Sequence, residues 1–277
     1  LDSKDALMLA GSLRFSYFQA IWRCRHFWFS LVQLDLRTRY RRSILGLGWS
    51  LLNPVAMTAI LCVVFHKLFH MSVTEYAPHV LCGLAIWNYI TSSTMQGCHA
   101  FFQGESYIRQ CSMPLAIFPL RTALGTTFHF LIALSVVVLL VIGLGLLGYR
   151  QLHLLPLINI VPAAVMLFFV CWSLSILAGM ANVYFQDTQH LLEVGFQMFF
   201  YATPIIYKAN VLESYGFGWV LDYNPVVVFL KLIREPILDG TAPSLTTYVQ
   251  AFMILAITSG LASYLMSRAQ KRLIFHL

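Results

Sequence analysis

Aromatic residues are the side chains of this sequence best suited to act on a ligand. The chain holds 21 Phe, 13 Tyr and 6 Trp. A sugar ring has an apolar C–H face that stacks on an aromatic ring, and its hydroxyls can bond a tyrosine O–H. Candidate residues for a path along which a sugar chain slides are Trp49, Trp87, Tyr89, Phe199, Tyr201 and Tyr207. The commoner use of such residues is packing or a belt at a membrane interface, and that alternative stays open.

Motifs for enzymatic chemistry are missing from the sequence. It has no G-x-x-x-x-G-K-[ST] loop to cradle ATP, no G-x-S-x-G elbow and no H-E-x-x-H pair. Glu193 is the acid nearest to the middle of an apolar stretch, and we place it near the inner membrane face, which argues against proton coupling. We therefore predict no catalytic residue, no metal site and no cofactor in this chain, and a source of energy outside it.

The composition predicts that the protein lies in lipid. Hydrophobic residues make up 59% of the 277 residues and charged residues only 10%, against about 25% charged in soluble domains. A membrane-spanning helix needs about 20 mostly apolar residues. We predict an all-α integral membrane protein with one transmembrane domain over residues 1–277 and six spanning helices within 45–267, at 45–66, 79–101, 118–147, 155–181, 190–207 and 246–267.

The basic residues predict the orientation. Six spans place both termini on one side, and with both inside, most Lys and Arg fall in cytosolic segments, among them Arg109, Arg121, Arg268 and Lys271. We expect a multi-pass protein of the cytoplasmic membrane with cytosolic termini. Anchoring of these cytosolic ends also explains the net charge of +7 without a nucleic-acid partner.

Residues 14–42 resemble a helix that lies on the membrane surface. Aromatic and basic side chains alternate there, and such residues settle at the headgroup level and bind phosphates. The segment is either a simple anchor or a helix that also contacts a cytosolic partner. Its predicted anchoring residues are Trp22, Arg37, Arg39, Tyr40, Arg41 and Arg42.

Residues 208–245 are predicted to form an outer segment with two short helices at 216–221 and 225–234, each too short to cross. Asn224 is a good helix cap, and Pro225 suits the first helical turn. Glu235-Pro236 should end or interrupt the second helix, and Asp239-Gly240 should form a turn. We predict that these helices dip into the outer leaflet or close a cavity, with Tyr223, Asn224 and Pro225 at this outer gate.

Several motifs in order along the chain resemble a known family. They are the run from Arg37 to Gly46 followed by Trp49 and Asn53-Pro54, the stretch Asn182–Asp187, Thr203-Pro-Ile-Ile-Tyr207, Tyr223-Asn-Pro225, and Arg234–Gly240. Together they resemble the permease subunits of ABC transporters that export polysaccharide, of the O-antigen, capsule and teichoic-acid type. The resemblance covers about residues 35–240.

The resemblance implies partners and a mechanism. It implies a homodimer of this chain, two copies of a separate cytosolic ABC ATPase that binds ATP and Mg, and a lipid-linked glycan as substrate. It also implies that the loop from Phe102 to Pro114 forms the coupling helix that touches the ATPase, with Glu105, Tyr107 and Arg109 as the contact residues.

Two other classes of function remain open from the sequence. An ABC permease for a small lipid or drug would share the fold, but it would not need a continuous aromatic-lined canal between two copies. A membrane-embedded glycosyltransferase or acyltransferase would need a cluster of acids or histidines at one membrane face, and we find no convincing set.

Overall fold

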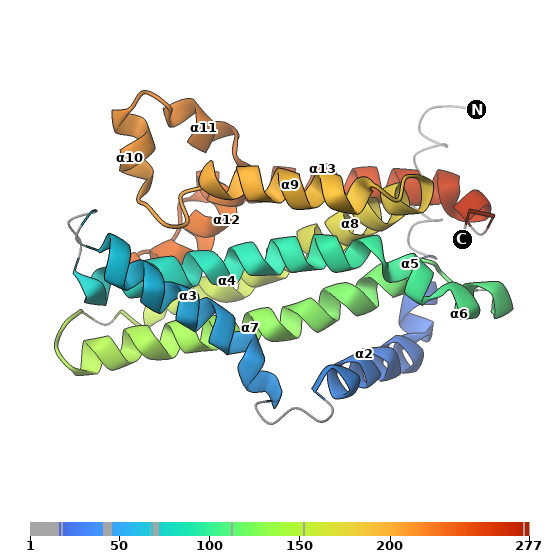
Figure 1. Cartoon of the computed structure of the whole chain (residues 1–277), viewed down its shortest axis with the longest axis horizontal. Coiled ribbons are helices and arrows are strands. Elements are labelled where there is room, and N and C mark those ends of the chain that lie inside the picture. Colours follow the sequence, from blue (N-terminus) through green and yellow to red (C-terminus); the bar gives the residue numbers. More distant parts are fainter. Residues whose placement is uncertain are drawn as a thin grey trace.

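The protein is an elongated bundle of helices (Figure 1). The structure is a computed structural model, and it describes residues 17, 19–40, 46–66, 68, 72–111, 113–151, 153–273, 275 and 276. The elements are α2 (Arg25–Tyr40), η1 (Gly46–Gly48), α3 (Trp49–Phe65), α4 (Val73–Cys98), α5 (Ala100–Gln103), α6 (Glu105–Gln110), α7 (Ile117–Leu146), η2 (Leu155–Asn159), α8 (Ile160–Tyr184), α9 (Thr188–Tyr201), α10 (Ala209–Ser214), α11 (Gly218–Tyr223), α12 (Pro225–Arg234), η3 (Glu235–Asp239) and α13 (Leu245–Leu273). The described residues contain no strand.

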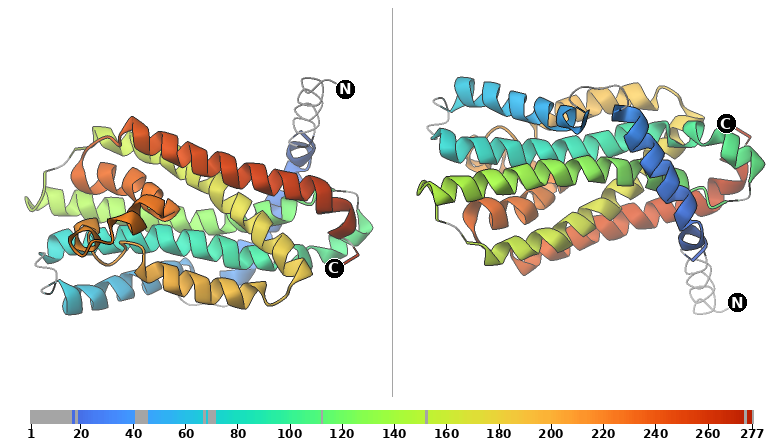
Figure 2. Two further views of the ribbon diagram at one scale, coloured as in Figure 1. Left: turned by 90° about the horizontal axis from the view of Figure 1, so that it is seen from above. Right: turned by 90° about the horizontal axis from the view of Figure 1, so that it is seen from below.

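Six of the helices run lengthwise along the molecule, namely α3, α4, α7, α8, α9 and α13 (Figures 1 and 2). They correspond to the six predicted spans, with boundaries that differ by a few residues. Three of them are long and apolar enough to cross a membrane: Ile117–Leu146, Leu155–Tyr184 (which joins η2 to α8) and Leu245–Ala269. The chain is therefore all-helical in its described part and has membrane-compatible spans, and the count of six stays a prediction.

The fifth predicted span ends earlier than expected. Its helix, α9, stops at Tyr201 instead of residue 207. Pro204 explains the difference, because a proline disfavours helical backbone at the residue before it and has no N–H for the helix ladder. Residues 202–208 instead form an irregular link to α10.

The outer segment holds one helix more than predicted. Three short helices, α10, α11 and α12, lie at one end of the bundle (Figure 1). The predicted cap is confirmed, because the Asn224 side chain accepts a hydrogen bond from the Val226 N–H at 2.9 Å and Pro225 opens α12. The predicted interruption at Glu235-Pro236 is also confirmed, since α12 gives way there to the π-helical turn η3, which ends at Gly240 with φ 64°. The sequence missed α10, which is only six residues long.

Loss of the Asn224 cap gives a testable change in stability. We expect Asn224→Ala to lower the free energy of unfolding by about 1 kcal/mol, and somewhat more because Asn224 Nδ2 also donates to Thr203 Oγ1 at 2.9 Å. Thermal unfolding of the detergent-solubilised protein measures this. The control is Asn210→Ala, at an exposed position of α10, and an equal loss in both variants would contradict the capping role.

The opposite end of the bundle holds α5, α6 and the end of α13, with residues 19–23 nearby (Figure 1). Helix α2 crosses the bundle obliquely (Figure 2, right) and packs against α7. Two apolar cores follow from this layout. One fills the space among α4, α7, α8 and α12, and the other joins α2, α5, α7, α8 and α13.

Candidate transport surface and coupling end

Helix α4 is the central helix of the candidate site. It packs against α3, α7, α8 and α9, and most of its side chains are buried. The exceptions in its second half are five partly exposed residues, Asn88, Thr91, Ser92, Met95 and Gln96. They form an open edge of α4 between α3 and α9, with a cavity on each side of it.

The cavity on the α9 side has a volume of about 350 Å³. Trp87 lines this cavity, and its ring contacts the rings of Phe196, Phe199 and Phe200 with centroids 5.9, 6.2 and 5.5 Å apart. Tyr201 lies on the rim and is 67% exposed. The polar lining comes from Thr91, Glu193 and Gln197, so this wall combines aromatic faces with hydrogen-bonding groups.

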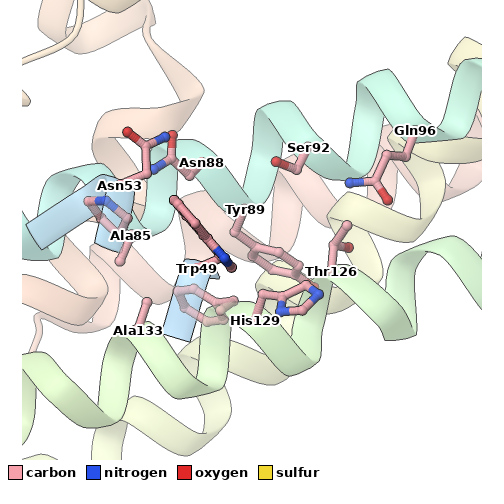
Figure 3. Close-up of a pocket in the computed structure, with 12 residues that line it drawn as sticks. Trp49, Asn53, Ala85, Asn88, Tyr89, Ser92, Gln96, Thr126, His129 and Ala133 are labelled. Atoms are coloured by element: carbon pink, nitrogen blue, oxygen red, sulfur yellow. The ribbon is translucent and has the colours of Figure 1, made fainter. Parts of the chain in front are cut away.

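The cavity on the α3 side has a volume of about 410 Å³ and is drawn in Figure 3. Trp49 lines this cavity, and its side chain is 55% exposed. Tyr89 is only 3% exposed, because its ring stacks on Phe130 at 4.6 Å and its hydroxyl lies 2.7 Å from Thr127 Oγ1. The predicted aromatic residues therefore fall into two groups on opposite sides of α4 and do not form one continuous row in a single chain.

Tyr207 belongs to neither cavity. Its hydroxyl donates to the Tyr201 carbonyl at 2.7 Å, and its own carbonyl lies 3.3 Å from His79 Nε2. It therefore fixes the irregular link after α9 to the start of α4.

The predicted coupling residues lie on α6, at the end of the bundle opposite α10 and α11 (Figure 1). Glu105 and Arg109 form an exposed ion pair one turn apart, with Nε and Oε1 2.8 Å from each other. Tyr107 is 37% exposed, and the edge of its ring meets Phe27 of the α2 segment with centroids 5.3 Å apart. Tyr107 thus joins α6 to α2 while leaving part of its surface open.

Helix α2 and the residues before it are tied to the bundle by polar contacts that the sequence did not reveal. Asp35 accepts two hydrogen bonds from the guanidinium of Arg121 on α7. The Tyr17 hydroxyl accepts from the Ala116 N–H at 3.3 Å, and burial raises the pKa of Tyr17 above its ordinary value. Charge spacing along 14–42 could not indicate these partners, because they lie about 90 residues away in the sequence.

The predicted anchoring residues are placed only in part. Trp22 and Arg37 are exposed, and the guanidinium of Arg25 lies 5.9 Å from the Trp22 ring centroid, a cation–π contact. Arg39 and Tyr40 continue the helical backbone of α2. Arg41 and Arg42 lie outside the described residues.

The outer gate residues take different positions. Tyr223 is strongly exposed at the end of α11, while Asn224 is buried against Thr203 and holds α12 to the end of α9. Arg234 is the most tightly held side chain of this end: it donates to the carbonyls of Pro204, His79 and Ile205 at 2.6, 3.1 and 3.1 Å. Arg234 was placed from the sequence only within a family motif, although a cation in an apolar segment before Glu-Pro already indicates a buried structural role.

The sequence is similar to known transport proteins. Residues 26–238 match the family model of the ABC-2 type transporter. The chain is 26% identical to an O-antigen export system permease protein RfbA of Klebsiella pneumoniae over 75% of its length and 78% of that protein. It is 24% identical to an O-antigen export system permease protein RfbA of Myxococcus xanthus over 72% of its length and 75% of that protein. The chain belongs to the ABC-2 type transporter membrane family.

Proposed function

We propose that this chain is the permease subunit of an ATP-driven exporter that carries lipid-linked polysaccharide across the cytoplasmic membrane. The wall around α4 carries this proposal, because it joins the Trp87–Phe199–Phe200 cluster to partly exposed amides and hydroxyls in a membrane domain. Aromatic faces bind the C–H faces of sugars, and the polar groups exchange hydrogen bonds with their hydroxyls. The similarity to O-antigen export permeases over three quarters of the chain supports the same substrate class.

The six long helices are proposed as six spans with cytosolic termini. Helix α4 has 26 residues, which is long enough to cross the membrane. Its polar edge must face away from lipid. Helices α3 and α9 have 17 and 14 residues and are about 25 and 21 Å long. Residues next to each helix must therefore complete its crossing of the membrane. Their exposed apolar faces, for example Val63 on α3 and Leu191 on α9, fit lipid or a second copy of this chain.

The proposed mechanism transmits force from one end of the bundle. ATP and Mg are bound by a separate ATPase, present in two copies, which presses on α6 of each permease subunit. Tyr107 passes this movement to α2 through Phe27, and Gly104 passes it to α7, because its backbone packs directly against the Phe118 ring. The α4–α9 walls of two subunits then line one canal, and the polymer slides along sequence-tolerant aromatic surfaces.

Deletion of the gene tests the proposed function. In the organism that encodes this chain, we expect loss of one surface polysaccharide and accumulation of its lipid-linked form on the cytosolic side. Immunoblots of intact and lysed cells measure both pools, and a plasmid copy restores export. A permease for a small lipid or drug would leave the surface polysaccharide unchanged, and that result would contradict the proposal.

The coupling role of Tyr107 gives a second test. We expect Tyr107→Ala to weaken the complex with the ATPase by roughly tenfold or more, since tyrosines at interface centres are worth about 2 kcal/mol. Pull-down of the ATPase with tagged permease over a concentration series measures this. The matched control is Tyr215→Ala, an exposed tyrosine at the other end of the molecule. Equal binding by both variants would show that α6 is not the contact.

A further inference from the structure

The cavity among α3, α4 and α7 has a row of neutral polar side chains along its α4 wall (Figure 3). Asn88, Ser92 and Gln96 follow one another along α4 at steps of four residues, so they lie on one face of the helix. The opposite walls add Asn53 from α3 and Thr126 and His129 from α7. Trp49 stands over this face from the start of α3 (Figure 3).

These polar side chains lack the internal partners that satisfy their neighbours. Thr91 and Thr94 donate to carbonyls of their own helix, and Ser93 lies 2.6 Å from Thr126 Oγ1. By contrast, the side chains of Asn53, Asn88, Ser92 and Gln96 have no hydrogen-bond partner within the described part of the chain. These side chains are exposed or partly exposed, so their amides and hydroxyls are open to exchange hydrogen bonds with a bound polar ligand.

The lining also restricts the chemistry of that occupant. The described lining residues include His129 but no Lys, Arg, Asp or Glu, so the cavity offers no permanently charged partner for a phosphate or an ammonium group. Amide and hydroxyl groups offer both donors and acceptors, and the indole of Trp49 offers an apolar face. The volume of about 410 Å³ falls within the range of about 300–1,000 Å³ that is usual for small-ligand sites. A neutral, hydroxyl-rich ring fits these properties of charge, hydrogen bonding, apolar surface and volume.

We propose that this cavity is a sugar-binding site within each subunit, which holds a neutral monosaccharide unit of the exported polymer beside the canal. This inference rests on the proposed function and makes it more specific. Trp49 stacks on the ring, while Asn88, Ser92 and Gln96, spaced about 6 Å apart along α4, bond its hydroxyls. The site lies on the side of α4 opposite the Trp87–Phe199 cluster, so the α3 side holds the sugar and the α9 side guides the moving chain.

Thiol labelling in membranes tests the site. Cys24 and Cys111 are replaced by Ser, because the other four native cysteines are buried, and Ser92→Cys is added. Inverted vesicles are labelled with a small water-soluble methanethiosulfonate. One set comes from cells with intact polymer synthesis and an ATPase variant that does not hydrolyse ATP, so that the host's own lipid-linked polymer is retained. The other set comes from cells that make no polymer.

We expect labelling at Ser92→Cys to be at least tenfold slower when polymer is retained. Ser267→Cys, an exposed Ser-to-Cys control at the end of α13 near α5 and α6, should react equally in both sets. Gln197→Cys, on the α9 wall, reports the canal separately. Adding Gln96→Leu should restore labelling at Ser92→Cys at least threefold and leave protection at Gln197→Cys unchanged, and gel filtration verifies that each variant folds.

The outcomes separate this inference from the proposed function. If polymer protects Gln197→Cys but not Ser92→Cys, the cavity holds only water and the sugar site is wrong, while the export function stands. If Ser92→Cys is protected but Gln96→Leu changes nothing, the protection comes from a blocked canal and the site is again wrong. If neither position is protected, the proposed passage of polymer along α4 fails together with the site.

Discussion

Gly97→Ala is expected to abolish most of the folded protein, although it adds a single methyl group. Helices α4 and α8 cross at Gly97, and a Cβ there would lie 2.6 Å from both Cα and Oγ of Ser175. On the facing helix, Gly179 lies four residues after Ser175, and a Cβ on it would lie 2.6 Å from the Gly97 carbonyl oxygen. Small residues four apart let membrane helices approach closely, and overpacking such a contact costs about 1–3 kcal/mol or more.

The measurement for this prediction is the yield and melting temperature of detergent-solubilised protein by size-exclusion chromatography. Gly125→Ala is the matched control, because Gly125 lies inside α7 and a Cβ there would meet nothing within 4 Å. The control should match or exceed the parent, since alanine is favoured over glycine in helices by about 1 kcal/mol. Equal yields of the two variants would contradict the close crossing.

Arg234→Met is expected to be the most damaging change at the outer end. The guanidinium of Arg234 joins three carbonyls that belong to the link after α9 and to α4, and it packs directly on Gly83. Hydrogen bonds to a charged group are worth about 1.5–3 kcal/mol each, and removal of the donor leaves the carbonyls buried and unpaired. We expect a loss of at least about 3 kcal/mol and loss of export even where some protein folds.

Two further variants sharpen the Arg234 prediction. Lys231→Met changes an exposed cation on the same helix and should leave export unchanged. Arg234→Lys keeps the charge but loses the planar fork that reaches several acceptors, so we expect it to resemble Arg234→Met more than the parent. Export by surface immunoblot, divided by protein abundance, measures both. Full export by Arg234→Lys would show that charge alone matters here.

The long helices were predictable because most of them are runs of apolar residues bounded by proline, glycine or polar residues. Pro114 and Pro119 flank the start of α7, and the Asn224-Pro225 pair sets the start of α12. Helix α9 was predicted too long, because hydropathy alone does not register the break that Pro204 imposes. Helix α10 was missed because six residues are too few to show a period of 3.6.

The site was less predictable, since its geometry depends on contacts distant in sequence. Tyr89 and Trp87 are two residues apart, yet the first faces Phe130 on α7 and the second faces α9. Aromatic composition alone could not separate these two sides. The signal for the polar cavity was present as Asn88, Ser92 and Gln96 at four-residue steps, but a search for charged residues in the spans passes over neutral amides.

The most direct test of the account is transport into inverted membrane vesicles that contain this chain, its ATPase and lipid-linked polymer made by the host. Polymer inside the vesicles is measured as the fraction protected from an added polysaccharide-degrading enzyme. We predict that protection requires ATP, the ATPase and this chain together, and that the purified chain alone hydrolyses no ATP. Protection of polymer without the ATPase, or ATP hydrolysis by this chain alone, would contradict the account.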